Sequence, residues 1–400
     1  MKRWWPWILS LPYAALPLFP AFITLTAVTV PGVSLVPAGL VWAVLPLIVV
    51  DAAIAVVIFA RGPFDLSPVF WPLCGWLGAG VLAAIFGFDP VGGAFFLGLF
   101  ALGIVWHAGV WYFGRDPASM RATIAVFLST GAISALLAIG MVVLRAPAGQ
   151  YTIGHGRAIG TFILPGELAG YLIIYLPIAA AVAFTSRARA MRVLAWAGVA
   201  LGGIAFAMTF SRAGWTGLAA AGAFYLATGR RGLRLRWAIA PIAVGLVLVL
   251  AFFNVNHNPS ENFTRLSIWQ SALAIVDRFP LTGVGPFDFA TAYALVRMPD
   301  GEPTAFHAHS FPLTIFAETG IVGLAAVTWA WWRFASALRA AIGRATPRHA
   351  ALALAVAAGL FGTLVQGLID TVSVVIFGLW MPTMALALVF ARDGLGEDAA

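Results

Sequence analysis

Apolar runs about as long as a membrane crossing recur from one end of this chain to the other. A helix needs about 20 predominantly apolar residues to cross the hydrocarbon layer of a bilayer. The chain has 400 residues, of which 62% are hydrophobic and 10% are charged, whereas an ordinary soluble domain carries roughly 25% charged residues. We therefore predict an all-α fold, a polytopic transmembrane helical bundle that forms a single integral membrane domain over residues 1–400.

Twelve spans fit the hydropathy pattern. The first begins after Lys2 and Arg3, as a signal peptide does, but its apolar stretch is long and further spans follow, so we expect it to be retained. The predicted spans cover about residues 7–30, 36–60, 68–87, 91–113, 122–144, 166–185, 193–210, 213–228, 237–254, 311–332, 350–370 and 372–391.

The positive charge of the chain predicts its orientation in the membrane. The net charge is +8, but there is one lysine and the arginines lie mainly in short turns between apolar runs, which is typical of topology signals and not of nucleic-acid binding. With the N-terminus inside, the outer side receives six of the 23 Lys and Arg residues, which leaves 23 − 6 = 17 inside. Both termini are then cytoplasmic. The single cysteine, Cys74, lies in an apolar run and is interpreted as core packing.

A polar segment from Ser260 to Gly323 interrupts the apolar pattern. We predict an outer, periplasmic loop over residues 255–310, between the ninth and tenth spans. Within it, Leu266, Trp269, Leu273 and Val276 have the spacing of an amphipathic helix that lies on the membrane. Charged groups gathered between two hydrophobic spans are the first place to look for chemistry.

Arg212 lies in a nearly unbroken apolar stretch from Val193 to Ala227. An arginine there requires a partner, because a charge at the bilayer edge is costly. It is either a snorkelling arginine at the end of a span or a clamp for an anion.

Arg265 and Trp269 share one face of the amphipathic helix, which brings a guanidinium and an indole together. This pair either anchors the helix among lipid headgroups or binds a ligand. Guanidinium groups match phosphate oxygens bidentately, so Arg212 and Arg265 on one side of the membrane suit a pyrophosphate.

His309 lies just before the tenth span, with Ser310 as a possible helix cap and Pro312 in the first turn. The positive end of that helix and nearby arginines favour a neutral imidazole, which a general base requires. The alternative is a structural histidine at the membrane interface.

Starting at His309, the chain reads His-Ser, nine residues, Gly320, two residues, Gly323, which resembles the O-antigen ligase signature His-[Asn/Ser/Gln]-x9-Gly-x2-Gly. Three further elements resemble the family in the expected order. These are GRAIGTF at residues 156–162, Ser-Arg-Ala at 211–213, and RLSIW at 265–269 followed by a loop with Gly283 and Gly285. One departure is LPGELAG after GRAIGTF, where the family has Pro-Asn, which leaves Glu167 as a candidate substitute.

The resemblance implies a bacterial inner-membrane glycosyltransferase of the GT-C type, inverting and independent of metals and other cofactors. Its donor would be a polyprenyl-pyrophosphate-linked glycan, and its acceptor the hydroxyl of lipid A-core, of a growing glycan or of a protein. It implies that His309 is the general base, that Arg212 and Arg265 bind the pyrophosphate, and that Arg157, Trp269, Gly283, Gly285 and Ser310 contribute to substrate binding.

The same polar segment and the spans around it allow other interpretations. Glu318 is out of phase with His309 on a helix, so we expect it to point elsewhere. His307 with His309 is a weak zinc signal, and Gly283-Val284-Gly285 lacks the context of a dinucleotide site. Asp288, Asp300 and Glu302 either contact the acceptor or belong to a solvated loop. A transporter or flippase would carry polar groups near mid-bilayer, where this chain has few, mainly Asp51 and Glu318.

Overall fold

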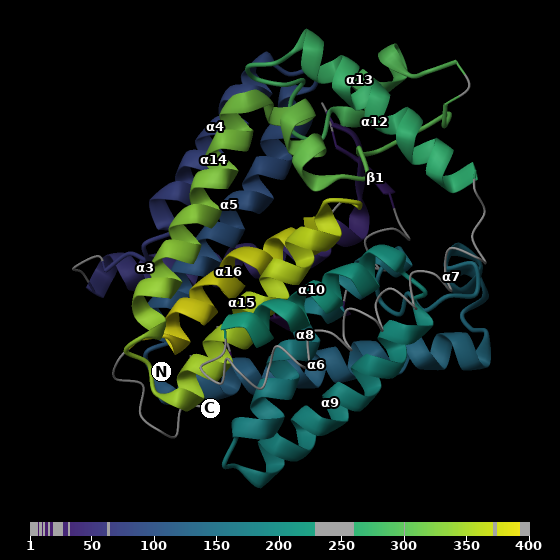
Figure 1. Ribbon diagram of the computed structural model, residues 1–400. Helices are drawn as coiled ribbons and strands as arrows, with labels where there is room; N and C mark the ends of the chain where they lie inside the picture. Colours follow the sequence, from purple (N-terminus) through teal and green to yellow (C-terminus); the bar gives the residue numbers. More distant parts are fainter. Residues whose placement is uncertain are drawn as a thin grey trace.

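The computed structural model describes residues 27–30, 33–61, 65–228, 260–299, 301–370 and 374–392, together with residues 7, 10, 13, 14, 17 and 18. Apart from one short hairpin, its regular structure is helical (Figure 1). The strands are β1 (Ala27–Val30) and β2 (Val33–Pro37). The helices are α3 (Ala38–Arg61), α4 (Phe70–Phe86), α5 (Pro90–Phe113), α6 (Pro117–Leu144), α7 (Ala148–Ile153), α8 (Pro165–Thr185), α9 (Arg189–Met208), α10 (Arg212–Thr228), α12 (Ser260–Arg278), α13 (Phe289–Val296), α14 (Phe311–Ile342), α15 (Pro347–Gly367) and α16 (Val374–Phe390).

Six of these helices, α5, α6, α8, α9, α14 and α15, are long and apolar enough to cross a membrane, and shorter apolar stretches lie in α3, α4 and α16. The predicted spans from 36–60 to 213–228, and those from 311–332 onward, coincide with helices. The chain is thus a multi-pass membrane protein. The predicted span 237–254 lies outside the described residues, so a total of twelve stays a prediction.

The N-terminal region differs from the prediction. Residues 27–30, the end of the predicted span 7–30, form β1, which pairs antiparallel with β2 through Ala27 opposite Pro37 and Val30 opposite Val33. The sequence explains this pairing, because β-branched residues flank the Pro31-Gly32 dipeptide, a combination that favours a hairpin over a helix. The predicted span 7–30 is therefore wrong at its end, over residues 27–30.

The helices α8 and α15 are the most enclosed of the membrane-spanning helices. Helix α10 packs along α15, and α15 along α8. Gly217 of α10 approaches α15 so closely that a Cβ there would lie 2.6 Å from the carbonyl oxygen of Gly362 and 3.1 Å from Cβ of Gln366. Small residues let membrane helices approach in this way, and this contact places the start of α10 beside the end of α15.

Helices α12 and α13 form a separate layer at one end of α14 (Figure 1). Its apolar core includes Ile268, Ala272 and Ile275 of α12, packed with residues of α13 and with Ala308. The predicted stripe is divided between two environments: Leu266 and Leu273 are 52% and 57% exposed, whereas Val276 packs against this core. The helix itself is confirmed, and its exposed apolar side remains available for membrane contact.

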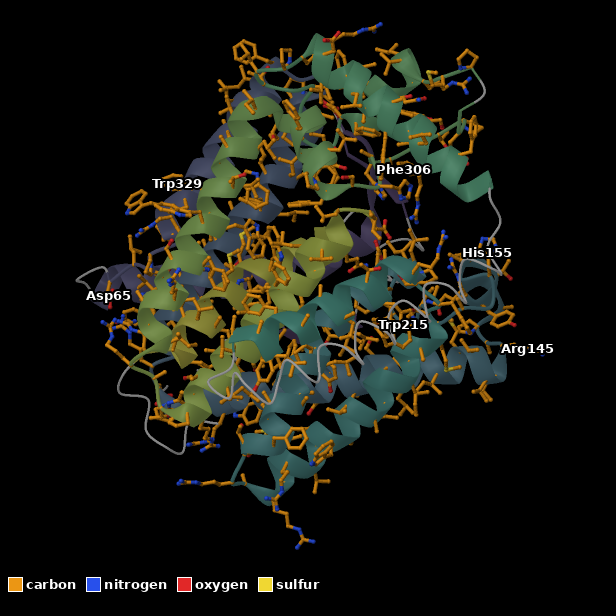
Figure 2. All side chains as sticks on the ribbon, viewed as in Figure 1. Asp65, Arg145, His155, Trp215, Phe306 and Trp329 are labelled. Atoms are coloured by element: carbon orange, nitrogen blue, oxygen red, sulfur yellow. The ribbon has the colours of Figure 1, made fainter. Side chains whose placement is uncertain are left out.

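A charged cluster lies far from this layer, at the other end of α5 (Figure 2). Asp65 accepts hydrogen bonds from Arg115, just beyond α5, and from Arg392, just beyond α16, at 3.2 Å for the latter. The Arg392 guanidinium lies 4.1 Å from the ring centre of Trp111. Slight burial raises the pKa of Asp65, but the two arginines outweigh it and hold that pKa below its usual value. The cluster joins the ends of α5 and α16.

Candidate functional site

Helix α14 is broken near its start, and a loop from α12 fills the break. Gly320 has φ 63° and ψ −166° inside the helix. The backbone groups that lose their helical partners there bond to the loop instead: Ile321 N donates to Pro280 O at 2.9 Å, and Gly285 N donates to Glu318 O at 3.0 Å. We call this interlocked structure, residues 279–289 together with 317–322, the clasp.

The two loop glycines are part of the clasp. A Cβ at Gly283 would lie 2.3 Å from the backbone carbon of Glu318, and Gly283 N already donates to Phe279 O at 3.1 Å. Gly285 N is likewise bonded, as above, so neither amide is left for a phosphate. The structure gives both glycines a packing role, and their assignment to substrate binding stays a prediction.

Two acids hold the clasp in place. The carboxylate of Asp288 accepts a hydrogen bond from Asp89 N at 2.9 Å, which joins the loop to the start of α5. Glu318 accepts from the backbone of Phe287 and Phe289. Both carboxylates therefore accept hydrogen bonds inside the protein. Asp288 is buried, so it does not belong to a solvated loop, and its contact with the acceptor stays a prediction. Asp300 lies outside the described residues, and Glu302 contributes its carbonyl oxygen to Tyr293.

His309 ends the loop that leads into α14. Ser310 stands at the N-cap position, as predicted, but its side chain makes no capping hydrogen bond. Thr314 orders the segment instead: its hydroxyl accepts a hydrogen bond from Ala308 N at 3.1 Å, and its backbone N donates to Ser310 O at 2.8 Å. The backbone on both sides of His309 is thus tied to the first turn of α14.

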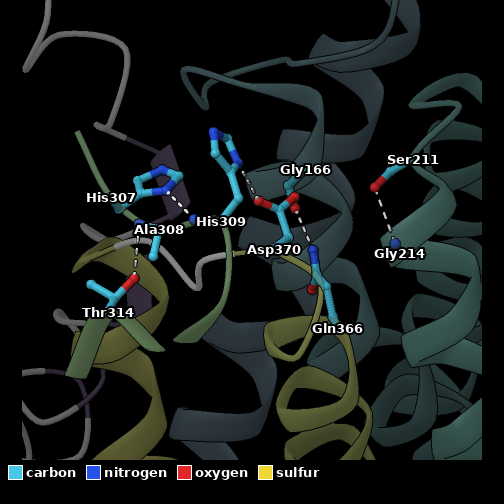
Figure 3. A network of polar contacts seen from close by, with 9 residues as sticks. All are labelled: Gly166, Ser211, Gly214, His307, Ala308, His309, Thr314, Gln366 and Asp370. Atoms are coloured by element: carbon cyan, nitrogen blue, oxygen red, sulfur yellow. Dashed lines mark hydrogen bonds and ion pairs between the residues drawn. The ribbon is translucent and has the colours of Figure 1, made fainter. Parts of the chain in front are cut away.

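The imidazole of His309 meets a carboxylate from a distant part of the chain (Figure 3). Its Nδ1 lies 3.4 Å from Oδ1 of Asp370, and the two side chains are 34% and 21% exposed. A carboxylate accepts hydrogen bonds and does not donate them, so Nδ1 carries the proton and Nε2 of a neutral ring keeps its lone pair. At 3.4 Å the contact is longer than an ordinary N–H···O hydrogen bond.

Asp370 follows the end of α15 and is held there by several contacts. Its backbone N donates to Gln366 O at 3.0 Å, and the Gln366 side chain donates to Gly166 O, at the start of α8, at 2.9 Å. A Cβ at Gly166 would lie 2.9 Å from Oδ2 of Asp370. The end of α15 and the beginnings of α8 and α14 therefore converge on the His309–Asp370 pair.

Arg212 opens α10 on the same side of the bundle. The hydroxyl of Ser211 accepts a hydrogen bond from Gly214 N at 3.0 Å and so caps this helix (Figure 3). Since α10 contacts Gln366 through Gly217, its first residue lies toward the end of α15 that bears Asp370. The turn that contains Arg157 joins here too, because Ala158 N donates to Met208 O, just before the α9–α10 junction, at 2.9 Å.

Arg265 and Trp269 lie on α12, both partly buried. Ile268, between them, shares an apolar core with Ala308, the residue before His309, so this part of α12 lies beside the loop that carries His309. The indole N–H of Trp269 is buried without a hydrogen-bond partner among the described residues. Such a group is a ready donor to a ligand oxygen.

The carboxylate of Glu167 stabilises the start of its own helix, α8. Its carboxylate accepts a hydrogen bond from Ile163 N at 3.1 Å, across the bend that begins α8. It therefore fixes the segment between the Arg157 turn and α8. This contact gives Glu167 a structural role in the LPGELAG segment.

Residues 197–328 match the family model described as O-antigen ligase. The match supports the O-antigen ligase superfamily for this segment of the chain. The match extends from α9 to the first half of α14 and so includes Arg212, Arg265 and His309. A comparison with curated proteins gives no match.

The matched O-antigen ligase segment does not contain every residue at this site. Asp370 lies outside it, and the sequence interpretation did not single it out. The available signal was a lone acid at the junction of two apolar spans, on the side predicted for His309. The sequence marks His307 only as a weak zinc signal, yet its Nδ1 accepts a hydrogen bond from the backbone N of His309.

Proposed function

We propose that this protein is a glycosyltransferase that transfers a polyprenyl-pyrophosphate-linked oligo- or polysaccharide to a hydroxyl acceptor at the outer, periplasmic face of the inner membrane, as an O-antigen ligase acting on lipid A-core. The observation that carries the proposal is the His309–Asp370 pair, 3.4 Å apart, at the end of the bundle where Arg212 begins α10. The family match supports the reaction class.

The reaction joins the acceptor oxygen to the anomeric carbon of the donor sugar. His309 Nε2 takes the proton from the acceptor hydroxyl as that oxygen attacks, because Nδ1 is occupied by Asp370. The bond between the anomeric carbon and the phosphate oxygen breaks, and its electron pair leaves with the polyprenyl pyrophosphate. A single displacement of this kind inverts the anomeric configuration.

The leaving group gains negative charge as its bond to the sugar breaks. Arg212 and Arg265 hold this pyrophosphate, and their guanidinium groups stabilise the developing charge. The capped start of α10 adds a favourable field for an anion, since the N-terminus of a helix carries partial positive charge. Arg157 and Trp269 contact the donor beside them.

The acceptor distinguishes the enzymes that share this chemistry. A polymerase adds repeat units to a glycan on the carrier lipid, and a protein O-oligosaccharyltransferase uses a protein hydroxyl. A flippase belongs to another class, and a proton-coupled one can also use histidine and acid side chains as a proton relay. The His309–Asp370 pair lies just before α14 and just after α15, at the end of the bundle, and this position favours a transferase.

Deletion of the gene and electrophoresis of surface glycolipids test the proposal directly. If the protein is a ligase, its deletion should leave bare core on the surface and free polymer on the carrier lipid. Core that bears a single repeat unit would instead show a polymerase, unmodified glycoprotein with normal lipopolysaccharide a protein transferase, and a loss of glycan export a flippase. Any of these three results overturns the ligase assignment.

Arg212→Lys tests whether a guanidinium is needed or only a positive charge. Lysine keeps the charge but loses the planar, bidentate geometry. A lost charge-assisted hydrogen bond is worth about 1.5–3 kcal/mol, so we expect kcat/KM to fall roughly tenfold to a hundredfold in a purified transfer assay. The matched control is Arg192→Lys, near the start of α9, whereas Arg212 lies just beyond the end of that helix. Equal activity of Arg212→Lys and wild type would leave charge alone as the role of Arg212.

A further inference from the structure

His307 lies two residues before His309 and contacts it in two ways. Its Nδ1 accepts a hydrogen bond from the backbone N of His309 at 3.2 Å. The two rings also meet edge to face, with their centres 4.4 Å apart and their planes at 71° (Figure 3). The function proposed above uses His309 and assigns no role to His307.

The backbone of His309 has an unusual conformation. Its φ is 48°, in the left-handed region, which residues with a side chain adopt rarely and which persists only where neighbouring contacts enforce it. The contacts here lie on both sides: Thr314 fixes Ala308 and Ser310, and His307 fixes the amide of His309 itself. This backbone conformation determines the direction in which the His309 ring leaves the loop.

We propose that His307 is a positioning residue, a neutral imidazole whose Nδ1 holds the backbone of His309 in its left-handed conformation and thereby directs the His309 ring toward Asp370. The proposal rests on the proposed function, because it concerns the base of that reaction. The bond resembles a turn in which an asparagine side chain accepts the amide two residues ahead.

The hydrogen bond fixes the protonation state of His307. A backbone amide is always a donor, so the Nδ1 of His307 carries no proton and Nε2 carries the one proton of a neutral ring. Burial lowers the pKa of His307, and the adjacent His309 lowers it further, while Asp370 acts in the opposite direction. A proton on Nδ1 would set two donors against each other and release the His309 amide.

Two substitutions separate positioning from general structural support. In His307→Asn the side-chain oxygen can accept the same amide two residues ahead, whereas His307→Ala removes the acceptor. Because a small misplacement of a catalytic group can cost about a hundredfold, we expect His307→Ala to lower kcat by about tenfold to a hundredfold and to leave the donor KM unchanged. We expect His307→Asn to restore kcat to near wild type.

The pH dependence of kcat gives a second kinetic result. In the wild type, a proton on Nδ1 of His307 would release the His309 amide, so protonation of His307 should reduce kcat on the acid side of the profile. His307→Asn lacks this titrating group, so its acid limb should be less steep than that of the wild type. An acid limb of equal steepness in His307→Asn and the wild type, or equal kcat values for the asparagine and alanine variants, would overturn the proposal.

A measurement without turnover keeps this test separate from the test of function. In protein labelled with 15N-histidine and held in detergent micelles, the spectrum at neutral pH should show His307 as the Nε2–H tautomer, assigned by the signal that His307→Asn removes. The Nδ1–H tautomer or an imidazolium would reject the proposal even if transfer is confirmed. If the expected tautomer is found but the wild type transfers no glycan, the positioning contact stands and the proposed function fails.

Discussion

Replacement of His309 by alanine should abolish glycan transfer while the protein still inserts into the membrane and folds. A general base contributes typically 10²–10⁴-fold to a rate. The alanine variant lacks the imidazole, so its side chain cannot take the acceptor proton. We expect kcat to fall by at least about 10²-fold in a purified assay, with donor binding retained. The same variant should fail to restore core-linked glycan in a strain that lacks the gene.

The matched control is Thr328→Ala, a change on the exposed side of α14, the helix that follows His309. Within the part of the chain that the structure describes, the Thr328 hydroxyl donates only to Leu324 O of its own helix, at 2.7 Å, so its loss should leave activity and detergent stability unchanged. Equal activity in His309→Ala and Thr328→Ala would remove His309 from the mechanism.

Asp370 should act through His309, which a double-mutant cycle can measure. Asp370→Asn keeps the shape of the side chain but no longer fixes the proton on Nδ1, so we expect a loss smaller than that of His309→Ala. When both residues are changed, the loss should equal that of His309→Ala alone, because residues that act as a unit are not additive. Additive losses would mean that Asp370 has a separate role.

The membrane-spanning helices could be predicted closely from the sequence. Hydropathy over about 20 residues is a local signal, and α8 at Pro165–Thr185 against a predicted 166–185 shows how closely it reports a helix. The same window failed at residues 27–30, because valines serve a strand as well as a span. Helix α14 continues to Ile342, past the predicted end at 332, since arginines at a helix end do not stop the helix.

The site was predictable only where its residues lie in one motif. His309, Gly320 and Gly323 are fixed by their spacing in the sequence. Asp370 is 61 residues from His309, so only the packing of α15 against α8 and α10 could bring it near. The buried side of α12 could not be predicted for a similar reason: Ile268 and Leu266 are both apolar, and tertiary contacts alone decide that Ile268 is the one buried in protein.

Gly320 is the residue on which the clasp depends most directly. Its φ of 63° with ψ of −166° lies in a region that only glycine adopts readily, and a Cβ there would lie 2.1 Å from Leu281 O and 2.6 Å from Thr282 N. Both atoms belong to the backbone, so no side chain can rotate to make room. We expect Gly320→Ala to destabilise the fold by about 3 kcal/mol or more, the sum of backbone strain and the lost clasp.

The loss should reach the site as well, because the clasp connects the C-terminal end of α12, the helix that carries Arg265 near its start, to α14, the helix that follows His309. Thermal unfolding in detergent should show a lower midpoint for Gly320→Ala, and transfer activity should fall even at temperatures where the variant remains folded. The control is Gly203→Ala in α9, where a Cβ meets nothing within 4 Å and alanine favours the helix. If Gly320→Ala were as stable and as active as Gly203→Ala, the break in α14 would not be what holds Arg265 and His309 in register.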